Sequence, residues 1–204
     1  GENRLAYNRK SLCIVCIPAN LPSDEPEKEK ALSNVAYLLS LEMEDILTNI
    51  EEKALDKYTP VVLKYDISPD ELVKFAEHYE RYPGMFWENR PRRVYPLRED
   101  ASQLIGYTGI ISREELNILQ THPEYHSGSI LGKMGIEDIY DETIRGYEGI
   151  MERKVDALGN VLEQTVTRDA VPGNPLLLSI HSDLQELAYE LLEDRTGAVI
   201  ISKP

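Results

Sequence analysis

The chain has 204 residues, of which 42% are apolar and 28% charged, a composition typical of a folded globular protein rather than a disordered one. Its formal net charge of -14 argues against a nucleic-acid-binding protein, because phosphate contacts need clustered Lys and Arg, and against direct docking on anionic lipid. No apolar run approaches the roughly 18 residues that a membrane span needs, and no signal-peptide pattern is present. The chain starts in mid-pattern at "GENRLAYN", which predicts a piece of a longer protein.

The first half of the chain alternates strand and helix patterns. Residues 5–17 predict a strand, and apolar residues at three- and four-residue steps predict one long helix over 32–50. A second strand is expected at 58–67, followed by a helix over 69–82 that begins at a capping box. Residues 85–96 predict a third strand, interrupted by proline.

Cys13 and Cys16 form a C-x-x-C inside the first predicted strand. Residues three apart in a strand lie about 10 Å from each other, beyond the roughly 7 Å limit for a disulfide. A redox C-x-x-C begins a helix, and a zinc site needs two further ligands at suitable spacing. The pattern therefore predicts buried strand cysteines.

The second half is more irregular. A short capped helix is expected at 112–120, and two strand-like arms at 149–169 predict a β-hairpin. A strand at 176–180, a capped helix at 182–192 and an apolar strand at 198–201 should follow.

The stretch "GKMGIEDIYDETIRGYEGI", residues 132–150, suggests two chemistries and fits neither. A phosphate-binding P-loop needs four residues before its Gly-Lys and then Ser or Thr, but Gly128 and Gly132 enclose three and Met134 follows the lysine. Lys133 also resembles the lysine of a K-T-G motif in penicillin-interacting enzymes. That chemistry needs S-x-x-K and S-x-N as well, and the sequence contains neither.

The same stretch is better explained as a turn that leads into a helix. Gly132 and Gly135 allow positive φ or close backbone approach, Glu137 suits the first helical turn, and Asp141 stands four before Arg145 for a side-chain pair. An apolar stripe is expected to be buried; it consists of Ile136, Ile139, Tyr140, Thr143, Ile144 and Tyr147.

No catalytic, cofactor-binding or metal site is predicted. His122 and His126 lie in a loop-like segment containing Pro123, and no acidic residue completes H-E-x-x-H.

Five segments stand in an order similar to that of class B penicillin-binding proteins, and the spacing resembles the elongation type, penicillin-binding protein 2. They are "LIGYTG", "GSILGKMGIEDIYDETIRGYEG", "VDALGN", "VPGNPLLLSIHSDLQELA" and "GAVIISKP". The resemblance is to the non-catalytic pedestal, or dimerisation domain, and continues into the start of the transpeptidase domain. Its structural-motif residues are Gly132, Lys133, Gly135, Ile136, Glu137, Arg145, Asp156 and Gly159.

The resemblance implies an α+β fold with an elongated pedestal. Residues 1–19 and 97–172 would form the base with its β-hairpin. A head subdomain of helix, strand, helix and strand would occupy 20–96. Residues 173–204 would supply the first helix and strand of a truncated transpeptidase domain.

For function, the resemblance implies a scaffold within a penicillin-sensitive D,D-transpeptidase that crosslinks peptidoglycan outside the cytoplasmic membrane. The expected partners are a SEDS-family glycan polymerase (RodA-like) and an MreC-like scaffold, with membrane attachment only through an N-terminal anchor that this chain lacks. An enzyme or ligand-binding domain with an unrecognised site stays open as the alternative.

Two surfaces are candidate interfaces. Phe86 and Trp87 are adjacent on a predicted strand and so face opposite sides; one should join the core and the other is a candidate partner anchor. Residues 176–204 carry apolar residues that need cover, so a homodimer through this segment is expected.

Overall fold

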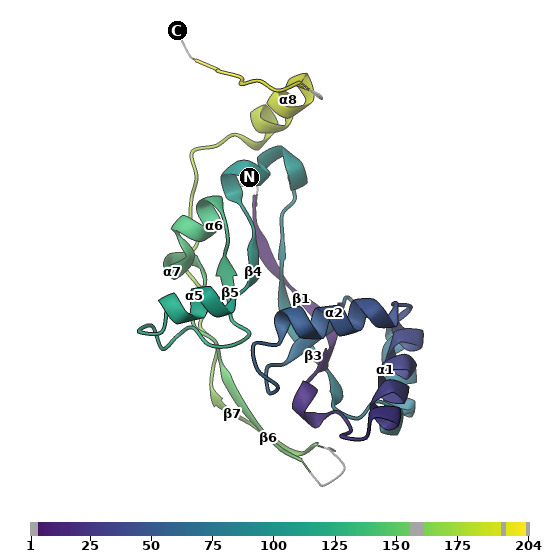
Figure 1. Ribbon diagram of the computed structural model, residues 1–204. Helices are drawn as coiled ribbons and strands as arrows, with labels where there is room; N and C mark the ends of the chain where they lie inside the picture. The colour runs from purple at the N-terminus through teal and green to yellow at the C-terminus, as the bar shows by residue number, and fades with distance from the viewer. Residues whose placement is uncertain (1–3, 156–160, 193–194, 203–204) are drawn as a thin grey trace.

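The computed structural model describes residues 4–155, 161–192 and 195–202, and Figure 1 shows their arrangement. The fold is α+β, with small antiparallel sheets and short helices. Within the described residues, no helix has the length and apolar character to cross a bilayer. The strands are β1 (Tyr7–Cys16), β2 (Val61–Tyr65), β3 (Met85–Val94), β4 (Thr108–Ile110), β5 (Ile130–Gly132), β6 (Ile150–Val155) and β7 (Val161–Arg168). The α-helices are α1 (Glu25–Leu39), α2 (Met43–Lys53), α3 (Pro69–Glu77), α4 (Ser102–Ile105), α5 (Arg113–Ile118), α6 (Gly135–Ile139), α7 (Asp141–Ile144) and α8 (Ser182–Leu192).

The largest sheet has the order β2-β1-β3, with β1 antiparallel to both neighbours. The central position of β1 follows from its sequence, because "LCIVC" is apolar at consecutive positions and can be buried on both faces. The predicted head at 20–96 supplies only the two edge strands; the central strand comes from the segment assigned to the base. Pro91 does not interrupt β3, since β3 is an edge strand, where a missing N–H is tolerated.

Helices α1 and α2 replace the single helix predicted over 32–50, so that prediction is wrong. The chain turns at Ser40, whose φ of 53° is left-handed, and the N–H of Leu41 donates to the carbonyl of Ala36 at 2.9 Å. A left-handed residue after the last turn is a common way to end a helix. The apolar spacing continues across the break because both helices pack on the same core.

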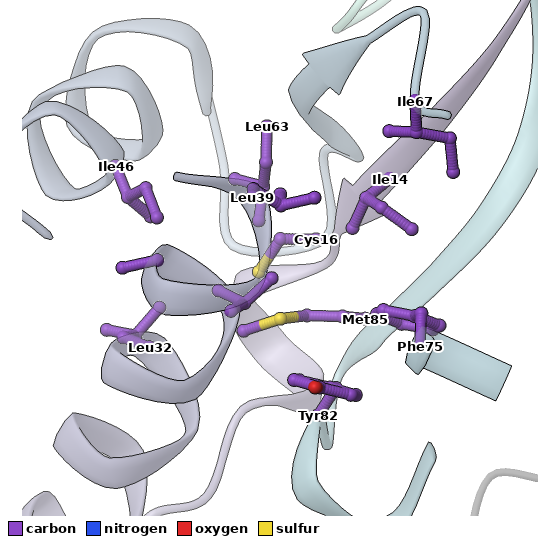
Figure 2. Packing of buried hydrophobic residues seen from close by; sticks show 12 residues of the cluster. Ile14, Cys16, Leu32, Leu39, Ile46, Leu63, Ile67, Phe75, Tyr82 and Met85 are labelled. Carbon is purple, nitrogen blue, oxygen red and sulfur yellow. The ribbon is translucent and has the colours of Figure 1, made fainter. Parts of the chain in front are cut away.

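This core lies between the sheet and the helices, where Figure 2 shows Ile14, Cys16, Leu39 and Met85 pointing into one interior. Phe75 of α3 stacks on the ring of Tyr82 with centroids 4.6 Å apart. The remaining labelled members are Leu32, Ile46, Leu63 and Ile67.

Both cysteines are buried and free, which confirms the sequence prediction. Cys16 belongs to the helix-side core, whereas Cys13 packs with Val15 and Val62 in a separate cluster. Burial raises the pKa of the Cys16 thiol to about 12, and burial is also the main reason that the pKa of Cys13 is raised to about 11.

Local signals predicted two helix starts correctly. Ser68 and Glu71 form the capping box of α3, although α3 ends at Glu77, before the predicted Tyr82. Ser112 and Glu115 form a second capping box at α5.

The C-terminal part contains two confirmed predictions, the hairpin and the helix over 182–192, and two wrong ones. β6 and β7 pair as the predicted hairpin, but its turn at Gly159-Asn160 and the motif residue Asp156 lie outside the described residues. Residues 176–180 and 198–201, predicted as strands, form none in the described chain. A strand needs a neighbour to complete its hydrogen-bond ladder, and apolar composition alone does not provide one.

Candidate functional site

The motif segment 132–145 leads from β5 through α6 and α7, and two of its glycines lie against other backbone. Gly135 has φ +64°, and a β-carbon there would lie 2.5 Å from the carbonyl oxygen of Leu104. At Gly132 a β-carbon would lie 2.0 Å from the carbonyl oxygen of Glu137. The two glycines therefore allow close backbone packing at the helix start, as the sequence suggested.

Glu137 is an acidic side chain that points inward, with only 3% of its surface exposed. Nε of Arg93, near the end of β3, donates to Oε1 of Glu137 at 2.7 Å. Nη1 of Arg93 also donates to the side-chain oxygen of Asn8 in β1 at 3.3 Å. This ion pair fastens α6 to the β1–β3 ladder.

Asp141 is the second inward-pointing acid, 7% exposed. Its carboxylate accepts the hydroxyl proton of Tyr125 at 2.9 Å and the backbone N–H of Gly132 at 2.8 Å. The predicted side-chain pair between Asp141 and Arg145 is not formed. Arg145 lies 3.8 Å above the ring of Tyr125 and donates to the carbonyl of Glu124 at 2.7 Å.

Lys133 forms an ion pair with Glu115, and 16% of the Lys133 side-chain surface is exposed. The same Glu115 carboxylate accepts the N–H of Ser112 at 2.6 Å in the α5 capping box. Burial raises the pKa of Glu115, but the hydrogen bonds from Lys133 and Ser112 outweigh it and the net pKa is lowered. The lysine that resembled a K-T-G lysine is thus committed to a structural contact.

The predicted apolar stripe is not buried: Ile139, Tyr140, Thr143 and Tyr147 are exposed, and only Ile136 and Ile144 are half-buried, so this prediction is wrong for four of its six members. Ile139 is 74% exposed, and Tyr140 and Tyr147 are exposed as well. The helix is interrupted at Tyr140, which separates α6 from α7, and the acids Glu137 and Asp141 take the inward positions.

The loop histidines each face one carboxylate. Nδ1 of His122 lies 3.2 Å from Glu124, and Nε2 of His126 lies 2.8 Å from Glu148. Across the described ranges, no group of three or more His, Cys, Asp or Glu is placed to hold a metal. Lys133 and Glu137 of the motif pair with Glu115 and Arg93, which lie outside it, and Arg145 donates to a backbone carbonyl. These contacts connect the motif to its surroundings.

Phe86 and Trp87 lie on opposite faces of β3, as predicted. Phe86 is half-buried against the Cys13 cluster. Trp87 is 41% exposed and meets the rings of Phe75 and Tyr79 edge-on, with centroids 5.9 and 6.1 Å away. Trp87 is therefore the more accessible of the two.

Sequence reasoning missed two features of this region. Tyr125 was not singled out, and its only signal was an aromatic residue between two loop histidines. The other feature is a second backbone contact: β-carbons at Gly146 and Gly173 would lie 2.2 Å from the carbonyl oxygen of Val171 and 2.0 Å from that of Ile144. Contacts between distant glycines leave no local spacing pattern.

The family model of the penicillin-binding protein dimerisation domain matches residues 1–178. The chain belongs to this family. The resemblance inferred from the motif order is confirmed, and the Lys133–Glu115 and Arg93–Glu137 pairs lie within the residues that the family model matches.

Among curated proteins, the chain is 28% identical over 190 residues to the peptidoglycan D,D-transpeptidase MrdA of Haemophilus influenzae, covering 90% of this chain and 29% of that protein. It is 25% identical over 204 residues to MrdA of Escherichia coli K12, and the match covers 98% of this chain and 32% of that protein. It is 29% identical over 200 residues to penicillin-binding protein 3 of Bacillus subtilis, and the match covers 98% of this chain and 28% of that protein. The chain thus spans about a third of the length of these relatives or less.

Among solved structures, the complex between penicillin-binding protein 2 and MreC from Helicobacter pylori is similar, with a TM-score of 0.66 and 23% identity. The match covers 94% of this chain and 36% of that one. The likeness shows that the two share a fold.

Proposed function

We propose that this dimerisation domain is a scaffold that holds the transpeptidase domain of a peptidoglycan D,D-transpeptidase away from the membrane and contacts cell-wall elongation partners. Family membership carries the proposal. The sequence adds support, since it has no S-x-x-K or S-x-N to accompany Lys133. The parent protein would act at the extracytoplasmic face of the cytoplasmic membrane.

The proposed layout keeps the base at 1–19 and 97–172, the head at 20–96 and the start of the transpeptidase domain at 173–204. The family model ends at residue 178, while the alignments with MrdA of Escherichia coli and penicillin-binding protein 3 cover 98% of the chain. Helix α8 exposes Leu184, Leu187 and Leu191. An apolar helix face of this kind fits an element whose cover comes from the rest of a larger domain.

The proposed partners are an MreC-like scaffold and a RodA-like SEDS glycan polymerase. The similar Helicobacter pylori protein was solved in complex with MreC, which supports the first. Trp87 is the proposed anchor, because exposed aromatic residues are enriched at interface hot spots.

Binding of the MreC-like protein from the same cell to the immobilised chain tests the partner proposal. Trp87→Ala should weaken binding, while Tyr37→Ala, which removes a 91% exposed aromatic side chain from α1, should not. Unchanged binding by Trp87→Ala and Phe86→Ala would remove β3 from the proposed interface.

In the isolated chain, we propose that a second copy covers the exposed apolar residues of 176–204. Light scattering on the whole chain and on a version ending at Asn174 tests this homodimer. If the whole chain and the shortened version are both monomeric and have the same melting temperature, the proposed homodimer is contradicted.

A further inference from the structure

A groove of about 410 Å³ separates α5 from the segment α6–α7, which lie beside each other in Figure 1. One wall carries Ile118 of α5, which is 77% exposed, and the other carries Ile139 of α6, which is 74% exposed. The floor includes Leu119, Leu131 and Tyr125, the last of which donates to Asp141. Asp141 and its hydrogen-bond partners Tyr125 and Gly132 therefore line an open groove whose surface is partly apolar and partly acidic.

Single exposed apolar side chains are normal on a protein surface. Ile118 and Ile139 differ from such single residues because they line the same groove, each with about three quarters of its surface exposed. One segment inserted into the groove would remove both side chains from water. Ile139 also belongs to the stripe that sequence periodicity predicts to be buried.

The charge around the groove is negative. Its lining contains four carboxylates, Glu115, Asp138, Asp141 and Glu142, and a single lysine, Lys133. Lys133 pairs with Glu115, and Asp141 accepts from Tyr125 and Gly132.

Two carboxylates of the lining remain available to pair with a cation on a bound segment. Asp138 and Glu142 are exposed, and neither is in an ion pair with any residue whose side chain the structure describes.

We propose that this groove docks a partner segment in which apolar side chains are flanked by lysine or arginine. The apolar side chains would cover Ile118 and Ile139, and the cations would meet Asp138 and Glu142. A second copy of the chain is the poorer occupant, because it carries a net charge of -14 and would meet the acidic rim with like charge. This inference rests on the proposed scaffold function and assigns a surface and a partner chemistry to it.

The test uses the full chain, isotopically labelled, titrated with a short synthetic peptide that carries leucine at helical spacing and lysine elsewhere. Amide resonances of the groove residues should shift in a saturable way. The double variant Asp138→Lys/Glu142→Lys and the double variant Ile118→Ser/Ile139→Ser should each weaken binding about tenfold or more. The matched controls are Glu51→Lys/Glu52→Lys, which reverses two exposed charges on α2, and Tyr37→Ser. Both control variants should bind the peptide with the same affinity as the parent chain.

Several results would overturn the inference. These are no saturable binding, shifts spread over the whole acidic surface, equal losses in the groove and control variants, or equal binding by a peptide with glutamate in place of lysine. Shifts of groove resonances that depend on the concentration of the chain alone would identify a second copy as the occupant and also overturn it. Because the partner-binding measurement on Trp87 uses another surface and another ligand, either result can fail without the other.

Discussion

Arg93 and Glu137 form an ion pair in which Glu137 is buried and Arg93 half-buried, with Nε of Arg93 donating to Oε1 of Glu137 at 2.7 Å. Arg93 lies near the end of β3, an edge strand of the three-stranded sheet, and Glu137 lies in α6. The pair therefore connects two parts of the fold that are far apart in the sequence, and removing either charge leaves the other without its partner.

Replacing Glu137 with Gln should lower the free energy of unfolding by about 2–3 kcal/mol, because Arg93 keeps its charge in a largely desolvated position. Denaturant unfolding measures the change, and Glu142→Gln, at an exposed carboxylate of the same segment, is the control. A double-mutant cycle with Arg93→Met isolates the coupling. A loss no larger than that of Glu142→Gln would show that the pair contributes nothing to stability.

Asp141→Asn should destabilise the chain by about 1–2 kcal/mol. An amide replaces one of the two acceptor oxygens with an NH2 group, so either the N–H of Gly132 loses its acceptor or the hydroxyl of Tyr125 must accept instead of donate. Thermal unfolding measures the loss, and Asp138→Asn, at the exposed groove rim, should melt with the parent. Equal melting of the two variants would contradict the role assigned to Asp141.

Alanine substitutions at three glycines should distinguish the stability lost to backbone strain from the stability lost to steric overlap. Gly135→Ala meets both, since φ is +64° and the new β-carbon would lie 2.5 Å from a carbonyl oxygen. Gly132→Ala meets overlap at 2.0 Å, and Gly128→Ala meets only strain, with φ +90° and its nearest neighbour 3.5 Å away. We expect losses on the order of 1–3 kcal/mol at Gly135 and Gly132 and about 1 kcal/mol at Gly128. Equal losses at all three would mean that the close backbone contacts are not a constraint.

The buried thiols should be nearly inert toward a thiol reagent at neutral pH and react together on unfolding. Burial holds the pKa of Cys16 at about 12 and that of Cys13 at about 11, so almost no thiolate is present in the folded state. Because these pKa values exceed the unfolded value of about 8.5, ionisation favours the unfolded chain and stability should fall as the pH rises above that value. A double Cys→Ser control loses the reaction, and rapid labelling of the folded parent would contradict the burial of Cys13 and Cys16.

Features encoded within a few residues were predictable. The capping boxes at Ser68 and Ser112 need only a hydroxyl and a Glu three residues later, and both are formed. The burial of Cys13 and Cys16 followed from the apolar run around them.

Features that depend on distant partners were not predictable. The break at Ser40 leaves the apolar spacing intact, because α1 and α2 share one core. Asp141 has Arg145 at favourable helical spacing, yet its partner is Tyr125, sixteen residues upstream in a loop. The segment 176–180 has the composition of a strand but no neighbouring strand to pair with in the described chain.

The central claim is that this chain carries no acyl-transfer chemistry, and intact-mass spectrometry after incubation with a penicillin tests it most directly. A serine nucleophile needs an adjacent activating base, and no serine in the sequence is followed three residues later by lysine. We predict a single species at the mass of the unmodified chain, with a transpeptidase domain from a related protein as the positive control. A stoichiometric covalent penicillin adduct would contradict the scaffold account.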